Sequence, residues 1–267
     1  MVNFYQLSKK IDSLKYWGQT QDVFKTQVGP LNQNLMKNLG PHRDLNNRLF
    51  DFYKEIEFNN DAFLMNSEQF NIMDYHNLEP VYTYTLNKTS EDEIYSPYGR
   101  MAIINKNYLN VNPINSSNGV HIDEQLQNDE DTLNILAPEQ FRHLKSKIID
   151  SYREWFYFYK VELDNMYNQD LGYPLNEKPI DDLAVNIIYT KKGQSYFTFN
   201  SFTGVSQNKI KDPIAILYYE SIDTSNIGAY ASTSLFFLDH SKGRAFKNIS
   251  SSLTRANVSE INHVASV

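Results

Sequence analysis

The chain has 267 residues, of which 41% are hydrophobic and 21% charged, and its formal net charge is −7. This length suits one large or two small domains, and the acidic balance argues against a protein that coats nucleic acid with a broad basic face. The absence of cysteine excludes disulfides, thiolate metal sites and cysteine nucleophiles. There is neither an apolar run of about 18 residues nor an apolar signal-peptide core, so we expect no membrane partner and a cytoplasmic location, or a particle assembled in the cytoplasm.

Residues 1–60 are predicted to be a helical region. Over residues 3–17 the apolar positions step by three and four, which is the period of an amphipathic helix. The apolar positions are Phe4, Leu7, Ile11, Leu14 and Trp17, with Lys9, Lys10 and Asp12 on the polar side. A polar stretch over residues 18–29 follows, and a second helix is expected after Pro30.

A third helix is expected to begin near Asp44, whose side chain is suited to capping a helix start. Gly40 and Pro41 are expected to interrupt the chain just before it. The apolar face of this helix consists of Leu45, Leu49, Phe52, Tyr53 and Ile56.

Residues 61–136 are predicted to be a mixed region of strands and loops. Residues 81–85, 101–104 and 108–111 form β-prone runs with turn signals between them. Residues 115–131 are polar and acidic, so we expect an exposed loop there, and long loops in compact proteins are commonly functional.

One long helix over residues 137–168 is predicted to organise the fold. Pro138 suits the first helical position, and no helix breaker follows until Gly172 and Pro174. The apolar face predicted from the helical period consists of Phe141, Leu144, Ile148, Tyr152, Trp155, Tyr159, Leu163 and Met166.

Five consecutive aromatic residues cover the whole circumference of this helix: Trp155, Phe156, Tyr157, Phe158 and Tyr159. A helix that is apolar on all sides is normally buried on all sides. The run is therefore either sandwiched in the core of the chain or pressed against another subunit.

Strand signals continue to residue 240. Residues 183–190 and 195–202 are predicted to flank a hairpin turn, and residues 214–220 and 229–238 supply two further strands. We expect an antiparallel meander, so residues 137–240 comprise the long helix and the sheet on which it packs. Residues 241–267 are rich in Ser and Asn and are expected to be an arm or tail. The predicted fold class is α+β, with a helical N-terminal part and one long central helix on a C-terminal antiparallel β-sheet.

Two H-x-D motifs are the chief candidates for a metal site. His42 with Asp44, or His121 with Asp123, could join His240 in the facial triad of a non-haem Fe(II) oxygenase. Arg244 or Arg255 could then bind the carboxylate of a co-substrate. Because the motif is short and lacks the expected strands around it, we expect no metal, no cofactor and no catalytic residue. The acidic clusters at 91–93, 123–124 and 129–131 are expected to be solvated.

The composition favours a structural assembly protein. The chain has no cysteine and 19 tyrosines, and its bias toward Asn, Lys, Ile and Tyr is the kind that an AT-rich genome gives. We associate this composition with bacteriophage virion components. We therefore expect a ring, neck or head-tail connector protein of a tailed bacteriophage virion. It would not be an enzyme, and it would bind copies of itself as a homo-oligomer and other virion proteins. The alternatives are the iron oxygenase and a bacterial binding or immunity protein.

Overall fold

The computed structural model describes residues 20, 22–28, 38–86, 95–203, 208–219, 224–241, 244–258 and 261–266. The helix expected over residues 3–17, nearly all of the helix expected after Pro30, and the acidic residues 91–93 lie outside this part of the chain. The chain contains both helices and a mixed multi-stranded sheet, as expected for the α+β class.

Within the described residues, the main sheet has eight strands, and two small hairpins lie outside it. In spatial order the strands of the sheet are β12 (Ile261–Ser266), β1 (Val23–Val28), β11 (Leu235–Leu238), β2 (Phe63–Asn66), β5 (Met101–Ile104), β10 (Ile214–Leu217), β6 (Thr132–Pro138) and β7 (Ala184–Thr190). The pairs β5–β10 and β6–β7 are parallel, and the other pairs are antiparallel. The hairpins are β3 (Ile72–His76) with β4 (Glu79–Tyr82), and β8 (Ser195–Phe197) with β9 (Lys209–Lys211).

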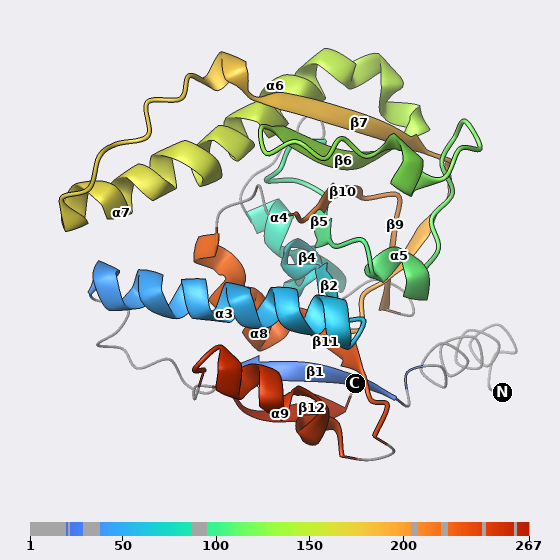
Figure 1. Cartoon of the computed structure of the whole chain (residues 1–267). Coiled ribbons are helices and arrows are strands. Elements are labelled where there is room, and N and C mark those ends of the chain that lie inside the picture. The colour runs from blue at the N-terminus through green and yellow to red at the C-terminus, as the bar shows by residue number, and fades with distance from the viewer. Residues whose placement is uncertain are drawn as a thin grey trace, which may run out of the picture.

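Helices of various lengths connect these strands (Figure 1). The α-helices are α3 (Leu39–Asn59), α4 (Thr83–Leu86), α5 (Tyr108–Val111), α6 (Lys145–Tyr157), α7 (Leu163–Leu171), α8 (Ile227–Thr233) and α9 (Ala245–Arg255). A π-helical turn, η6 (Phe158–Glu162), joins α6 to α7. The 3-10 helices are η2 (Glu68–Phe70), η4 (Ile122–Gln125), η5 (Glu139–Leu144), η7 (Ile180–Asp182) and η9 (Thr224–Asn226).

Both faces of the sheet are covered. Helices α3, α6, α8 and α9 pack on one face, where they meet strand residues such as Leu64 and Ile103. Helix α5, the loop that follows it and the β8–β9 hairpin pack on the other face, against Phe63 and Ala102. Successive strand residues point to opposite faces, so β2, β5, β6 and β10 are buried throughout and are almost wholly apolar.

The buried side chain of Asn105 connects the helical face to the sheet. Its Oδ1 accepts hydrogen bonds from the backbone N–H groups of Leu64 at 2.9 Å and Tyr108 at 3.2 Å. Its Nδ2 donates to Glu57 Oε1 at 2.6 Å and to the Ala62 carbonyl at 3.1 Å. One fully bonded amide thus fixes the end of β5 relative to α3, β2 and α5.

The long helix differs from its prediction at the start. Ala137 and Pro138 end the buried strand β6, and the α-helix begins only at Lys145, after η5. Pro138 adopts extended backbone angles, φ −55° and ψ 137°. Proline is tolerated at such a strand end because no backbone N–H is needed there to donate to a neighbouring strand. The helix ends as expected, since Gly172 takes the left-handed conformation, φ 72°, that closes a helix.

The predicted apolar face is confirmed as far as Tyr159, which is half-buried against the core, and it is wrong at Met166, beyond the π turn. The π turn inserts a five-residue step, so that Val161 follows Phe156 on the buried side. The buried face of α7 is consequently rotated to Tyr167, whereas Met166 is exposed.

The predicted antiparallel meander is wrong. Strand β7 pairs in parallel with β6 from Thr132↔Ala184 to Pro138↔Thr190, and the long helix is the crossover between them (Figure 1). Strand β8 pairs with β9 rather than with β7, and it stops at Phe197 because Phe199 has a positive φ of 51°. A β-ladder does not accommodate that conformation.

Several elements near the chain ends also differ from their prediction. The region 1–60 is not wholly helical, because β1 lies inside the main sheet. Asp44 does not cap α3, which already begins at Leu39 and places Gly40 and Pro41 in its first turn. A Cβ on Gly40 would lie 3.3 Å from a Leu171 methyl carbon, so the glycine allows close packing there. The apolar face expected for this helix is confirmed.

Three more segments differ in type. Residues 108–111 form helix α5 instead of a strand, and residues 229–238 are divided between α8 and β11. The run 81–85 is divided between β4 and α4. Within the expected tail 241–267, α9 buries Ala245, Ile249 and Leu253 in the core, and β12 pairs with β1. The tail prediction overlooked the amphipathic spacing of those three apolar residues.

We predict that Asn105→Ala lowers the free energy of unfolding by about 3 kcal/mol, because a buried donor left without a partner costs roughly 1–3 kcal/mol and several bonds are lost together. Thermal or urea unfolding measures this loss. Asn110→Ala, at an exposed position in α5, is the matched control and should change little. Equal effects of the two substitutions would contradict the role assigned to Asn105.

Candidate functional site

The aromatic run of the long helix is divided between core and surface. Trp155, only 6% exposed, and Phe156 are buried in the core, and Tyr157 and Tyr159 are half-buried against it. Phe158 is 38% exposed. The rings of Trp155 and Tyr159 lie 4.4 Å apart across the start of the π turn. Of the five candidates, Phe158 has the largest exposed fraction.

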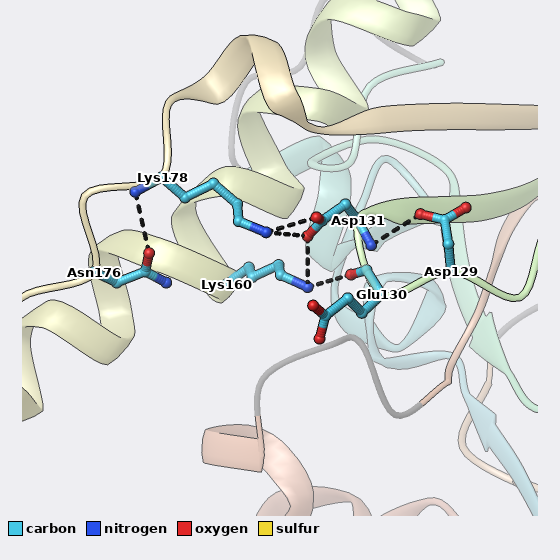
Figure 2. A network of polar contacts seen from close by, with 6 residues as sticks. All are labelled: Asp129, Glu130, Asp131, Lys160, Asn176 and Lys178. Atoms are coloured by element: carbon cyan, nitrogen blue, oxygen red, sulfur yellow. Dashed lines mark hydrogen bonds and ion pairs between the residues drawn. The ribbon is translucent and has the colours of Figure 1, made fainter.

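A network of charges fixes the same turn to the sheet (Figure 2). The Asp131 carboxylate pairs with Lys160 Nζ of the π turn at 3.1 Å and with Lys178 Nζ at 2.6 Å. The Lys178 ammonium, and secondarily Lys160, lower the pKa of Asp131, while Asp131 raises the pKa of Lys178. The prediction that the acidic cluster 129–131 is solvated is therefore wrong for Asp131. Its ion pairs connect the start of β6 to the helical segment that leads to β7.

The two H-x-D motifs lie in separate surroundings. His42 Nδ1 lies 2.8 Å from the Tyr167 hydroxyl, in the contact between α3 and α7. His121 lies before η4, and Asp123 pairs with Lys106 at 3.4 Å. His240 lies 3.9 Å from Asp61.

The arginines proposed for a co-substrate have other surroundings as well. Arg255 pairs with Glu55, and the Arg244 backbone N–H donates to Ser241. Within the described part of the chain, no three His, Cys, Asp or Glu side chains are grouped as metal ligands. The oxygenase alternative therefore has no assembled triad among these residues.

A cavity of about 500 Å³ lies where the parallel strands β5 and β10 end. Its wall includes Glu57 and Tyr53 of α3, and Lys106 and Asp123 pair beside it. The Tyr53 hydroxyl donates to Glu57 Oε1 at 2.8 Å, and burial, together with this carboxylate, raises the pKa of Tyr53 well above its usual range. The described wall residues include no serine, histidine or cysteine. The cavity thus offers hydrogen-bonding groups together with the charged side chains of Glu57, Lys106 and Asp123.

The β3–β4 hairpin presents apolar side chains to solvent. Met73 and Tyr75 of β3 are exposed, and Leu78 in the turn is 95% exposed. Asn77 and Leu78 have φ values of 50° and 70°, as in the type I′ turns that usually carry glycine. We call Met73, Tyr75 and Leu78 the hairpin surface.

The base of this hairpin is fixed to the body of the chain. Asn71 forms a β-bridge with Thr203, and the Thr83 backbone N–H donates to the Asn71 carbonyl at 3.1 Å. Phe70 packs on Tyr84 with ring centroids 5.7 Å apart. Sequence analysis missed the strand β3, because its turn is Asn-Leu and lacks the glycine that signals a tight hairpin.

Comparisons with protein-family models, with curated proteins and with solved structures found no match to this chain. Within the described residues, no helix combines the length and the apolar character needed to cross a membrane.

We predict that Trp155→Ala lowers the free energy of unfolding by about 3–5 kcal/mol, the usual result of emptying a buried Trp site. Phe158→Ala should have a much smaller effect on the melting of the isolated chain, because its ring is partly exposed. Urea unfolding of both variants tests this difference. An unchanged unfolding midpoint for Trp155→Ala would show that the helix is not central to the core.

We predict that Asp131→Asn lowers the free energy of unfolding by about 1 kcal/mol at neutral pH, or roughly 2–4 °C in Tm. Because the folded-state pKa of Asp131 is lowered, its stabilisation is present above the unfolded pKa of about 3.9 and is lost as the pH falls through the folded value. The difference from the wild type should therefore shrink in melts near pH 3. Asp129→Asn is the control, and a pH-independent difference for Asp131→Asn would contradict the ionic origin.

Proposed function

We propose that the chain is a structural assembly protein that binds further copies of itself through the hairpin surface. In this proposal it is a ring, neck or head-tail connector component of a tailed-bacteriophage particle. The biological setting is supported by composition: no cysteine, and many tyrosines and asparagines.

The observation that carries the proposal is Leu78. A non-glycine residue in the left-handed conformation costs roughly 1–2 kcal/mol, and Leu78 also leaves its apolar side chain almost wholly in solvent. Glycine would serve the isolated fold better at this position. A bulky apolar residue that benefits neither the turn nor the core is explained by a contact with another chain.

The neighbouring side chains suit the same contact. Tyr75 and Met73 add exposed aromatic and thioether surface, the residue types that are enriched at protein interfaces. The partner surface is expected to be an apolar recess that accepts the Leu78 side chain. Repetition of such a contact between two different patches closes identical subunits into a ring when the rotation from one subunit to the next divides a full turn.

We predict that Leu78→Gly weakens self-association without destabilising the fold. Relief of the strained turn should raise Tm or leave it unchanged, while mass photometry should show fewer oligomers. Leu175→Gly, which removes another exposed leucine from an irregular segment, is the matched control and should assemble normally.

Negative-stain electron microscopy should show closed rings for the wild type and for the control. A wild type that stays monomeric at every concentration would overturn the assembly proposal. Rings that persist unchanged in Leu78→Gly would instead show that the hairpin surface is not the contact.

A further inference from the structure

The cavity of about 500 Å³ lies where the chain leaves two neighbouring strands toward opposite faces of the sheet. Strands β5 and β10 are adjacent and parallel, and their last residues are Ile104 and Leu217. After β5 the chain forms α5, on the face covered by the β8–β9 hairpin. After β10 the next described helices are η9 and α8, and α8 packs on the face of α3. In open α/β sheets, ligands typically bind in the crevice that such diverging connections leave at the carboxyl ends of the strands.

Hydrogen bonds between the surrounding elements hold the walls of this cavity. The Asn107 side chain donates to the carbonyls of Glu57 at 2.8 Å and Ala62 at 3.1 Å, which fixes the end of α3 beside the residues that follow β5. The buried Asn134 of β6 accepts from the Gln127 N–H at 3.0 Å and donates to the Gln127 carbonyl at 2.8 Å, which fixes the loop after η4. Small-molecule sites are usually preformed recesses of about 300–1,000 Å³, and this cavity falls within that range.

The described wall carries two lysines, and each has a carboxylate partner. Lys106 pairs with Asp123 at 3.4 Å, and both side chains line the cavity. Lys54 lies 3.5 Å from Asp51 of the same helix. The charges of both lysines are therefore offset, and the described wall offers no excess of positive charge to an anionic ligand.

Glu57 supplies the wall with a carboxylate that neutral groups hold in place. The residue is half-buried, and its Oε1 accepts from the Tyr53 hydroxyl at 2.8 Å and from Asn105 Nδ2 at 2.6 Å. Neutral donors orient a carboxylate without cancelling its charge. A ligand that brings a positive charge to Glu57 would form a charge-assisted hydrogen bond, which is roughly twice as strong as one between neutral groups.

Two aromatic side chains of the wall face solvent. Phe58 directly follows Glu57 in the last turn of α3 and is 87% exposed, and Tyr219, just beyond β10, is 48% exposed. Aromatic faces attract cations and also pack on other aromatic rings. The wall thus combines a fixed carboxylate with aromatic surface, which suits a ligand that is both aromatic and cationic.

We propose that this cavity binds a small aromatic cation, such as an arylalkylamine or an aromatic amidine. The charged end of the ligand meets Glu57, and its ring lies against Phe58 and Tyr219. None of these residues belongs to the hairpin surface, so ligand binding and self-association are separable and are tested separately.

Two pairs of probes test the proposal in the full chain. Benzamidine and tryptamine are cations at neutral pH, and benzamide and tryptophol are their neutral counterparts of similar shape. We expect each cation to bind in the mM range or tighter, and at least about tenfold more tightly than its neutral counterpart, because only the cation forms a charge-assisted hydrogen bond with Glu57. Isothermal titration calorimetry, with ligand-observed NMR for the weaker probes, measures the dissociation constants.

Glu57→Gln and Asp44→Asn are a matched pair, since each removes one negative charge from α3. Glutamine keeps an oxygen that can accept from Tyr53 and Asn105, so the fold should persist. Glu57→Gln should abolish the preference for the cations. Asp44→Asn, at an exposed position outside the described wall, should leave that preference unchanged.

Phe58→Ala and Phe202→Ala form a second pair, because the two rings are exposed to a similar degree, 87% and 81%, and of the two only Phe58 lines the cavity. Phe58→Ala should weaken cation binding several-fold, and it keeps the test available if Glu57→Gln does not fold. Phe202→Ala should bind the cations as the wild type does.

Three results would overturn the cation site. The first is a wild type that binds neither cation more tightly than its neutral counterpart. The second is a preference for the cations that persists in Glu57→Gln. The third is equal affinity of the Phe58 and Phe202 variants for the cations.

Discussion

The side-chain amide of Asn105 is the constraint on which most of this architecture depends. It is wholly buried, and its oxygen and its two N–H groups bond to three elements, α3, β2 and α5, and to the Ala62 carbonyl in the turn between α3 and β2. No other residue type offers two acceptor lone pairs and two donor hydrogens in one plane at that size, apart from the longer glutamine. The turn between α3 and β2, the end of β5 and the start of α5 are therefore positioned together. The cavity beside Glu57 and the packing of Tyr108 under the β8–β9 hairpin follow from this arrangement.

A second organising feature is the crossover from β6 to β7. Parallel strands require a connection long enough to return to the same edge, and here the long helix provides it. Asp131 stands at the start of β6, and its carbonyl accepts from the Ala184 N–H at 2.8 Å at the start of β7. Its carboxylate pairs with Lys160 and Lys178, so this one residue contacts both the start of β7 and the helical segment between the two strands (Figure 2).

Sequence reasoning identified what depends on local pattern. The apolar face of α3, the strands β5 and β7, and the Gly172 terminus all follow from periodicity or from glycine conformation. Pairing partners were not predictable in this way, because parallel and antiparallel neighbours can be formed by the same apolar run. The π turn that begins at Phe158 could not be predicted from the 3.6-residue helical period either, because it changes the spacing of the buried residues at that point.

The candidate sites were harder to predict. The H-x-D motifs were chosen for their residue types, yet the fold places His42 against Tyr167 and His240 against Asp61. The hairpin surface was missed because its most informative residue, Leu78, is unusual only in its backbone conformation, which the sequence does not show. A leucine in an unknown loop is unremarkable, whereas a leucine at φ 70° with its side chain in solvent needs an explanation.

The position of β1 has a consequence for how the chain is made. Its two neighbours in the sheet, β11 and β12, are encoded near the other end of the described chain. At translation rates of about 5–20 residues per second, β1 leaves the ribosome on the order of 10–40 seconds before β11 exists. During that time a strand of which half the residues are polar presents unpaired backbone groups to other chains. Pairing between strands so far apart in sequence carries a large loop-closure entropy, so we expect the β12–β1–β11 part of the sheet to form late in folding.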